Sequence, residues 1–401
     1  MAQNTNRIQT THVGSLPRTE RLQKANLARR EGELPEADFQ KILTEEVQAV
    51  VAQQVETGID IVNDGEYGHA MTDPVDYGAW WSYSFTRTAG LEVLPDNAEG
   101  TEPHRSTPGN LKYTTFADRR DRQAFPAAYE EVVTSTAKGP STARPAATGE
   151  ISYIGQDAVA SDTANLNAAI KATGAQEGFV AALSPGSAAR VGNKHYSSDK
   201  EFLFAWADVL KQEYKAIIDA GLTVQIDDPS IAEGWDQINP EPSVSDYLNF
   251  IEDSVDALNY ALEGLPQEHI RFHLCWGSWH GPHTTDLEFK HLAKTLLSIN
   301  ASAYTFEAAN ARHAHEWKEW ENIELPAGKV IIPGVVSHST NVVEHPELVA
   351  QRIEQFTSVV GKENVIASTD CGLGGRIHPD IAWAKLRSLT EGAKIASERL
   401  F

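Results

Sequence analysis

Short apolar runs and longer amphipathic stretches alternate along most of the chain. The runs are rich in β-branched and aromatic residues and have the length of strands. After residue 144 they lie at 145–151, 178–183, 222–227, 270–276, 302–307, 330–336 and 365–369. Helical periodicity lies between or after them, near 158–172, 199–220, 244–263, 286–299, 346–360 and 379–399. This alternation predicts βα units and a parallel sheet.

Two more strands are expected near the N-terminus, at 8–15 and 59–63, with helices near 19–30 and 36–57 between them. The sequence thus offers nine candidate strands for the eight places of a (β/α)8 TIM barrel. One of them must lie outside the barrel, and the pattern does not say which. We predict an α/β fold with a single TIM-barrel domain over residues 1–401.

The periodicity is lost from residue 67 to about residue 139. Aromatic residues at 80–85 precede a polar tract near 95–110 and a charged, helical run near 117–136. Loops this long inside a compact domain are uncommon and are usually functional or mobile. We interpret approximately 67–144 as an insertion over the barrel mouth, a lid or an oligomer contact. A surface excursion with its own small core fits the pattern equally well.

The composition of the chain limits the kinds of partner that it can bind. The 401 residues carry a formal charge of −22, which argues against nucleic acid or an anionic membrane as a partner. No stretch approaches the roughly twenty apolar residues of a membrane span, and the N-terminus has no apolar signal segment. The two cysteines suit a reducing cytoplasm. We therefore expect a cytoplasmic protein that acts on small molecules, with a homo-oligomer left open.

Candidate chemistry begins at residues 271–277, where a predicted strand ends in a loop. His273 and Cys275 are two residues apart, so their side chains point to the same face of the strand. That is the geometry of two metal ligands on one rigid element. Taken alone, the pair is better explained by a buried thiol beside a hydrogen-bonded core histidine.

The second cysteine changes this interpretation. Cys371 follows the strand 365–369, and Glu307 stands at the end of the strand 302–307. In a parallel barrel the C-terminal strand ends meet on one face, where active sites are built. His273, Cys275, Glu307 and Cys371 would then meet at one point, as a ligand set that suits Zn²⁺.

The charge of that set predicts its chemistry. Two thiolates and a carboxylate outweigh the ion, so the metal would activate water poorly. Such a zinc can still bind a substrate thiol, lower its pKa and leave the sulfur nucleophilic. We therefore predict transfer of a carbon group to a thiol. A closed structural zinc is the alternative, but structural sites usually draw their ligands from short local loops.

The motifs, in their order, resemble the zinc-binding catalytic half of cobalamin-independent methionine synthase, and more closely the short, single-barrel members of that family. They include Ser-Thr-Asp-Cys-Gly-Leu around Cys371, with further matches from Thr10–Ser15 to Ala382–Lys385. The resemblance implies a barrel of the uroporphyrinogen decarboxylase/methionine synthase type. It maps the family's zinc ligands onto His273, Cys275, Glu307 and Cys371.

The same resemblance implies substrate contacts and a methyl transfer to a thiol such as homocysteine. Gly14, Ser15 and Glu66 would hold the amino acid part of the thiol, Asp227 its amino group, and Glu233 the pterin of the donor. His338, with a one-residue shift, would donate a proton to the leaving group. Among other flanking histidines, we expect most to be supporting or surface groups: His280, His283, His313 and His315.

The positions that contact the methyl donor in the family are less well matched in this sequence. A tryptophan that stacks on the pterin is absent from 183–190, and an arginine before the third strand is replaced in 141–144. The alternatives are an epoxide-opening thiol transferase resembling epoxyalkane:coenzyme M transferase, a zinc-binding protein without turnover, and a metal-free barrel decarboxylase. A thiol sulfonate would need a cation such as Arg18, Arg190, Lys194 or Arg376.

Overall fold

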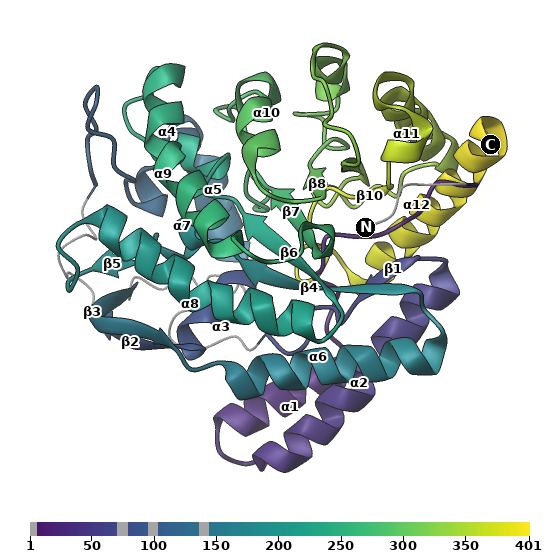
Figure 1. Ribbon diagram of the computed structural model, residues 1–401, viewed down its shortest axis with the longest axis horizontal. Coiled ribbons are helices and arrows are strands. Elements are labelled where there is room, and N and C mark those ends of the chain that lie inside the picture. Colours follow the sequence, from purple (N-terminus) through teal and green to yellow (C-terminus); the bar gives the residue numbers. More distant parts are fainter. Residues whose placement is uncertain (1–5, 70–78, 95–102, 136–143) are drawn as a thin grey trace.

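The central element is a curled parallel sheet of seven strands (Figure 1). The computed structural model describes residues 6–69, 79–94, 103–135 and 144–401. In spatial order the strands are β1 (Ile61–Asn63), β4 (Glu177–Leu183), β6 (Thr223–Asp228), β7 (Ile270–Leu274), β8 (Ala303–Phe306), β9 (Val330–Val336) and β10 (Ser368–Thr369). Every neighbouring pair is parallel, so all C-terminal strand ends lie at one edge.

The predicted N-terminal strand is only an isolated bridge, but it connects the two edges of the sheet. Thr10 forms a parallel bridge with Ala367, next to β10. On its other side the Thr10 carbonyl accepts hydrogen bonds from the backbone N–H groups of Asp60 and Ile61, at 3.1 Å each. The segment around Thr10 therefore lies between the first and last strands.

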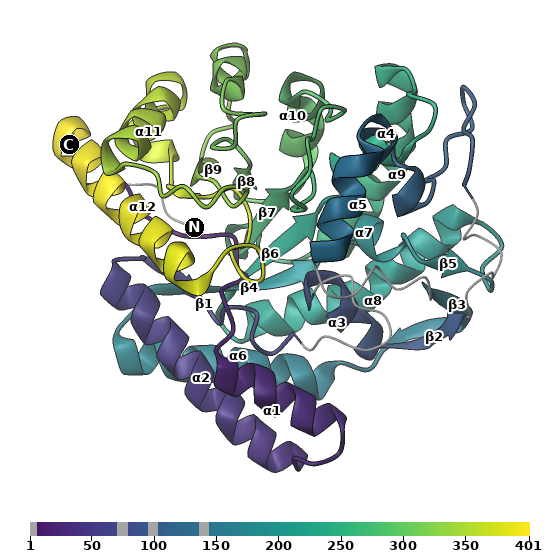
Figure 2. The same cartoon turned by 180° about the vertical axis from the view of Figure 1, so that it is seen from behind.

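Helices surround this sheet (Figures 1 and 2). They are α1 (Glu20–Arg30), α2 (Glu36–Thr57), α6 (Gln156–Thr173), α7 (Pro185–Ala188), α8 (Asp199–Asp219), α9 (Val244–Leu262), α10 (Phe289–Ser298), α11 (Pro346–Val360) and α12 (Pro379–Leu400). Local sequence sets their ends: the Ser198 and Ser243 hydroxyls cap α8 and α9, and Gly58 ends α2 at φ 94°. None of the described helices is long and apolar enough to cross a membrane.

The strand predicted at 145–151 lies outside the parallel sheet. It is β3 (Arg144–Tyr153), which pairs antiparallel with β2 (Thr88–Leu94) and parallel with β5 (Gly192–Asn193). Figure 1 shows this small sheet at the left, beyond the end of α8. The surplus ninth strand of the sequence is therefore β3. The sequence predicted this strand but could not single it out as the surplus one, because β2, its main partner, lies in the aperiodic region.

The described parts of the region predicted as an insertion contain helices as well as β2. They are α3 (Ala79–Thr86), the 3-10 turn Phe116–Asp118, α4 (Arg120–Ala124) and α5 (Pro126–Ser135), in agreement with the helical run expected near 117–136. The buried Asp121 carboxylate accepts the backbone N–H groups of His283 and Thr284, at 3.0 and 2.9 Å. This contact joins α4 to the loop that follows β7, where the predicted ligands lie.

One buried arginine crosses the interior between the N-terminal segment and the strands. Arg271 of β7 donates to Gln225 Oε1 at 2.7 Å, to Thr11 Oγ1 at 3.1 Å and to the His12 carbonyl at 2.6 Å. Its guanidinium carbon also lies 3.5 Å from the ring centre of Phe179. These contacts keep β4, β6, β7 and the segment 11–12 in register.

Candidate metal centre

The predicted metal ligands stand at the C-terminal ends of β7, β8 and β10. His273 is the penultimate residue of β7 and Cys275 follows that strand by one residue, while Glu307 comes directly after β8 and Cys371 two residues after β10. Parallel pairing of β7, β8, β9 and β10 in that order brings these ends to one edge, as the sequence predicted.

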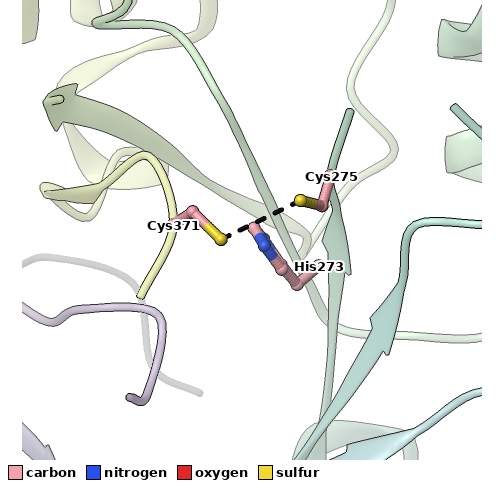
Figure 3. A group of neighbouring side chains, drawn as sticks. All are labelled: His273, Cys275 and Cys371. Atoms are coloured by element: carbon pink, nitrogen blue, oxygen red, sulfur yellow. Dashed lines mark hydrogen bonds between the residues drawn. The ribbon is translucent and has the colours of Figure 1, made fainter. Parts of the chain in front are cut away.

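Three of the four side chains form one compact group. Ligand atoms of His273, Cys275 and Cys371 all lie within 4.8 Å of one another, and the two sulfur atoms are 3.9 Å apart. Figure 3 shows the three side chains pointing toward one another from β7 and from the loop after β10. Both ring nitrogens of His273 are buried and have no hydrogen-bond partner among the described residues. This group could hold a metal ion.

The two thiols differ in acidity. Cys371 has a pKa well below the usual thiol value, because its hydrogen bond with Cys275 and the nearby His273 ring outweigh the effect of burial. The same hydrogen bond, together with burial, raises the pKa of Cys275 well above that value. The two side chains therefore share one proton. Cys275 carries it as a thiol, and Cys371 is the thiolate, which is the form that binds metals.

Glu307 belongs to a second group beside the first. One oxygen or nitrogen atom from each of Glu307, His338 and Asp370 lies within 4.8 Å of the others, and all three residues are buried. The Glu307 oxygens accept hydrogen bonds from the backbone N–H of Trp276 at 3.0 Å and from the side-chain Nδ2 of Asn310 at 2.6 Å. Burial and the neighbouring Asp370 raise the pKa of Glu307 to about 8. The charge of Cys371 adds to this rise, so the two groups are close enough to interact.

Asp370 was missed by sequence reasoning, although it directly precedes Cys371. Its Oδ1 accepts the backbone N–H groups of Ala308 and Ala309, both at 2.7 Å, and its buried Oδ2 has no partner in the described part of the chain. These bonds tie the end of β8 to the loop after β10. Neither ring nitrogen of His338 has a hydrogen-bond partner within the residues that the structure describes, and burial lowers the pKa of His338 to about 4. His338 is therefore neutral near pH 7 in this environment.

Two predicted substrate residues, Glu66 and Asp227, form a pair of buried carboxyl groups. Burial and the charge of Asp227 raise the pKa of Glu66 well above its usual value, and Glu66 Oε2 has no partner among the described residues. Burial raises the pKa of Asp227 to about 7, with Cys371 adding to the rise and His273 opposing it. Both carboxyl groups therefore lie within electrostatic reach of Cys371. Because burial disfavours their charged forms, a bound cation would stabilise the ionised carboxylates.

Gly14 and Ser15 are packed against the same groups. Gly14 has a φ of +136°, and a Cβ at this position would lie 2.6 Å from Glu66 Oε1, so only glycine leaves room for the carboxyl group. The Ser15 carbonyl accepts the backbone N–H groups of Leu373 and Gly374, at 2.9 and 3.0 Å. The N-terminal segment thus contacts both Glu66 and the loop that carries Cys371.

Glu233 has a different environment. Its two oxygens accept hydrogen bonds from Arg119 Nη2 at 2.5 Å and Arg190 Nη1 at 2.8 Å, and all three side chains are buried. These ion pairs lower the pKa of Glu233 against the effect of burial. The carboxylate is fully engaged by the protein, unlike that of Glu66.

Of the flanking histidines, His313 and His283 form part of a buried hydrogen-bond chain. His313 Nδ1 contacts Glu316 Oε2 at 2.7 Å and His313 Nε2 contacts Asp286 Oδ2 at 3.1 Å. Asp286 also contacts His283 Nδ1 at 3.0 Å. The supporting role expected for them agrees with this position, whereas His280 and His315 are exposed.

Fold and site together define an α/β protein with a candidate metal centre of one histidine and two cysteines at the C-terminal ends of its parallel strands. The chain belongs to the family described as cobalamin-independent synthase, catalytic domain, whose model matches residues 8–80 and 116–395. The unmatched stretch lies within the region predicted as an insertion.

Named relatives support the family and differ in length. The chain is 23% identical to a methionine synthase of Sulfurisphaera tokodaii, covering 98% of this chain and 94% of the relative. It is 24% identical to the 5-methyltetrahydropteroyltriglutamate–homocysteine methyltransferase of Thermotoga petrophila, covering 96% of this chain but only 44% of that longer protein. A B12-independent methionine synthase from Shewanella, solved with selenomethionine, shares the fold with a TM-score of 0.70 at 18% identity, over 98% of this chain and 99% of that one.

Proposed function

We propose that the protein is a zinc-dependent thiol alkyltransferase that moves a methyl group to a small thiol such as homocysteine. The observation that carries this proposal is the His273, Cys275 and Cys371 group beside the buried Glu66 and Asp227 carboxyls. A metal-binding group is what a thiol needs to become a bound thiolate. A pair of carboxyl groups beside it is what an amino acid thiol needs for its ammonium group.

The residues fit zinc. Two sulfur ligands at about 2.3 Å from a tetrahedral ion should lie about 3.8 Å apart, and the two sulfur atoms are 3.9 Å apart. His273 offers a buried ring nitrogen that no described residue engages in a hydrogen bond. We propose Glu307 as the fourth ligand, because its charge already acts on both cysteines. A zinc ion bound there would hold the sulfur atom of a substrate as a reactive thiolate.

The chain's own residues would then bind and orient the substrates. Glu66 and Asp227 hold the ammonium group, and the Gly14–Ser15 turn positions the backbone around it. His338 is neutral near pH 7 because of its burial, so it would act by donating a neutral N–H hydrogen bond to the leaving atom. We further propose that the segment at Thr10 completes a (β/α)8 barrel and that residues 67–144 form an insertion in this single domain. Reactive thiols of this kind suit a reducing cytoplasm.

The carboxyl pair discriminates between candidate thiols. Two buried carboxyl groups attract an ammonium group and repel a sulfonate, which favours homocysteine over coenzyme M as the acceptor. Glu233 is already paired with two arginines, so its predicted contact with a pterin requires that one of these ion pairs opens. The acceptor side of the proposal therefore rests on more of the observed geometry than methylfolate as the donor.

Metal analysis tests the proposal. We expect about one zinc ion per chain, and its loss in the variants Cys371→Ser and His273→Gln. The variant His291→Gln is a matched control, because His291 is a partly exposed histidine on α10. Zinc retained at wild-type content in Cys371→Ser would contradict the ligand assignment.

Thiol titration distinguishes an enzyme from a closed structural zinc. In the cobalt-substituted protein, homocysteine should produce a new thiolate-to-metal absorption. A structural site, with all its positions filled by the protein, would show none. A panel of homocysteine, coenzyme M and glutathione with methyl donors and short epoxides, read by mass spectrometry, then identifies the reaction.

A further inference from the structure

A polar pair of side chains lies directly beneath the candidate site. Gln225 of β6 pairs with Arg271 of β7 in the parallel register. Two residues further toward the C-terminal edge, Asp227 pairs with the proposed ligand His273. Side chains two residues apart on a strand share a face, so Gln225 and Arg271 stand one layer below Asp227 and His273. On its other side Arg271 contacts apolar packing, because its guanidinium carbon is 3.5 Å from the ring centre of Phe179.

The Gln225 side chain is completely buried, and all of its hydrogen-bonding groups are engaged. Its Nε2 donates to Asp227 Oδ1 at 2.7 Å and to the Val13 carbonyl at 2.5 Å. Its Oε1 accepts from Arg271 Nε at 2.7 Å. A guanidinium can only donate, so this contact identifies the oxygen end of the amide. The NH2 end must therefore face Asp227.

Arg271 holds the amide in this orientation. Its side chain is fully buried, and the three groups that accept its hydrogen bonds are all uncharged: Gln225 Oε1, Thr11 Oγ1 and the His12 carbonyl. Burying a guanidinium against uncharged partners costs free energy, and an apolar residue would fill this place in the sheet at lower cost. The arginine adds a rigid set of donors, which fixes the Gln225 oxygen and the N-terminal segment together.

Gln225 contacts both sides of the proposed amino acid subsite. The Val13 carbonyl that it binds directly precedes Gly14, which leaves room for the Glu66 carboxyl group. Among the described residues, only Gln225 donates a hydrogen bond to the Asp227 side chain, so Oδ1 is engaged and Oδ2 is left for a ligand. The Glu66 side chain differs, because no described residue donates a hydrogen bond to it.

We propose that Gln225 is a positioning residue, which decides the oxygen that Asp227 presents to the ligand and thereby sets the preference of the site for thiols with an ammonium group. The inference rests on the proposed function, because it needs a thiol at the metal centre with its ammonium group at the carboxyl pair. A carboxylate that is already held at one oxygen loses little side-chain freedom when the ammonium group binds.

Two thiols measure this preference in the cobalt-substituted protein. Homocysteine carries the ammonium group, and 4-mercaptobutyrate is the same molecule without it. The ratio of their dissociation constants, taken from the thiolate-to-cobalt absorption, gives the preference for the ammonium group. Gln225→Met has a side chain of similar size without an N–H donor, and it should lower this ratio about tenfold. The affinity for 4-mercaptobutyrate should stay unchanged.

A comparison of two other variants tests the orientation and leaves Gln225 in place. In Asp227→Asn, Gln225 would bind the oxygen of the new amide and turn its NH2 group toward the ammonium group of the ligand. In Glu66→Gln no described donor holds the new amide, so its oxygen can turn to the ligand. Asp227→Asn should therefore lose about tenfold more of the preference than Glu66→Gln.

The double variant Gln225→Met with Asp227→Asn gives a change of opposite sign. Without Gln225 the new amide can turn its oxygen toward the ligand, so the double variant should regain part of the preference that Asp227→Asn loses. Gln225→Met then lowers the preference in one background and raises it in the other. Lost packing alone would lower it in both.

Tyr304→Phe is the control for a lost buried hydrogen bond. The Tyr304 hydroxyl on β8 donates to the Ile299 and Ala301 carbonyls, at 2.8 and 3.2 Å. Its removal should reduce stability and leave the preference between the two thiols unchanged. If Gln225→Met does not fold, the comparison of Asp227→Asn with Glu66→Gln still decides the question.

Three results would overturn the inference while the proposed function stands. Gln225→Met could keep the wild-type preference, it could weaken both thiols equally, or Asp227→Asn could lose no more of the preference than Glu66→Gln. A wild-type protein that gives no cobalt absorption with homocysteine, or binds the two thiols equally well, would contradict the proposed function first. The inference would then fail with it.

Discussion

Glu66 and Asp227 carry the clearest chemistry at the scale of single residues. Both are buried, both have a raised pKa, and Glu66 Oε2 has no partner among the described residues. A buried polar atom without a partner costs free energy in the folded state. The cost is relieved when a ligand supplies the missing donor, and an ammonium group supplies one together with a positive charge.

Glu66→Gln should therefore weaken homocysteine binding by about ten- to hundredfold, because glutamine cannot ionise when an ammonium group binds beside it. 3-Mercaptopropionate, which has the thiol but lacks the ammonium group, should bind equally well to both proteins. Affinities follow from the cobalt absorption, with the exposed Glu45→Gln on α2 as the control. Equally weakened binding of both thiols would assign Glu66 a structural role.

In the wild type, homocysteine affinity should rise as pH increases through about 7, where Asp227 loses its proton.

At the scale of elements, the N-terminal segment contributes to the site through its backbone. Gly14 leaves space for the Glu66 carboxyl group, and the Ser15 carbonyl holds the loop after Cys371. The sequence predicted a strand at residues 8–15. The segment has a single β-bridge, at Thr10, so contacts with neighbouring elements hold it more than strand pairing does.

Gly14→Ala should separate these roles. The new methyl group would lie 2.6 Å from Glu66 Oε1, so we expect displacement of Glu66, reduced homocysteine affinity and a loss of about 2–3 kcal/mol of stability. Gly32→Ala is the matched control, because Gly32 also has a positive φ, +76°, but a Cβ added there would meet no atom within 4 Å. It should lose only about 1 kcal/mol and keep its thiol affinity. Urea unfolding measures both stabilities, and unchanged thiol affinity in Gly14→Ala would refute the contact.

Particular elements also show how far sequence carried the prediction. Alternating side chains placed His273 and Cys275 on one face, and parallel pairing brought Cys371 to them, because both effects follow from local periodicity and strand order. Asp370 escaped notice because its role depends on the N–H groups of Ala308 and Ala309 in another strand end. The pairing of β3 with β2 was equally hidden, since its pattern resembles that of a barrel strand. Contacts between distant residues decide both cases.

At the scale of the whole molecule, buried charges couple stability to pH. Burial alone would lower the pKa of His313, but its hydrogen bonds to Asp286 and Glu316 raise it to about 10, and Asp286 likewise raises the pKa of His283 to about 9. A histidine whose folded pKa exceeds its unfolded value of about 6.5 contributes stability that is fully present below pH 6.5. That contribution is lost as pH rises through 9 to 10.

His313→Gln should therefore destabilise the protein by about 3 kcal/mol at pH 6, where its removal leaves buried acids with one cation fewer. The difference from the wild type should shrink as pH approaches 10, because wild-type His313 is by then losing its own proton. Thermal unfolding across pH 6–10 measures the trend, with the exposed His315→Gln as the control. A difference that does not vary with pH would indicate lost packing instead of lost charge.

The bridge between Thr10 and Ala367 has a consequence for the order of events during synthesis. Ala367 leaves the ribosome more than 350 residues after Thr10, a delay of roughly 20–70 s at elongation rates of about 5–20 residues per second. Until then the N-terminal segment can contact only residues that have already been made, among them Asp60, Ile61 and Arg271. Cys371 emerges in the same last interval, so closure of the sheet and assembly of the ligand group become a single late step. A nascent chain that stalls before this point should neither join the two edges of the sheet nor complete the group that could hold a metal ion.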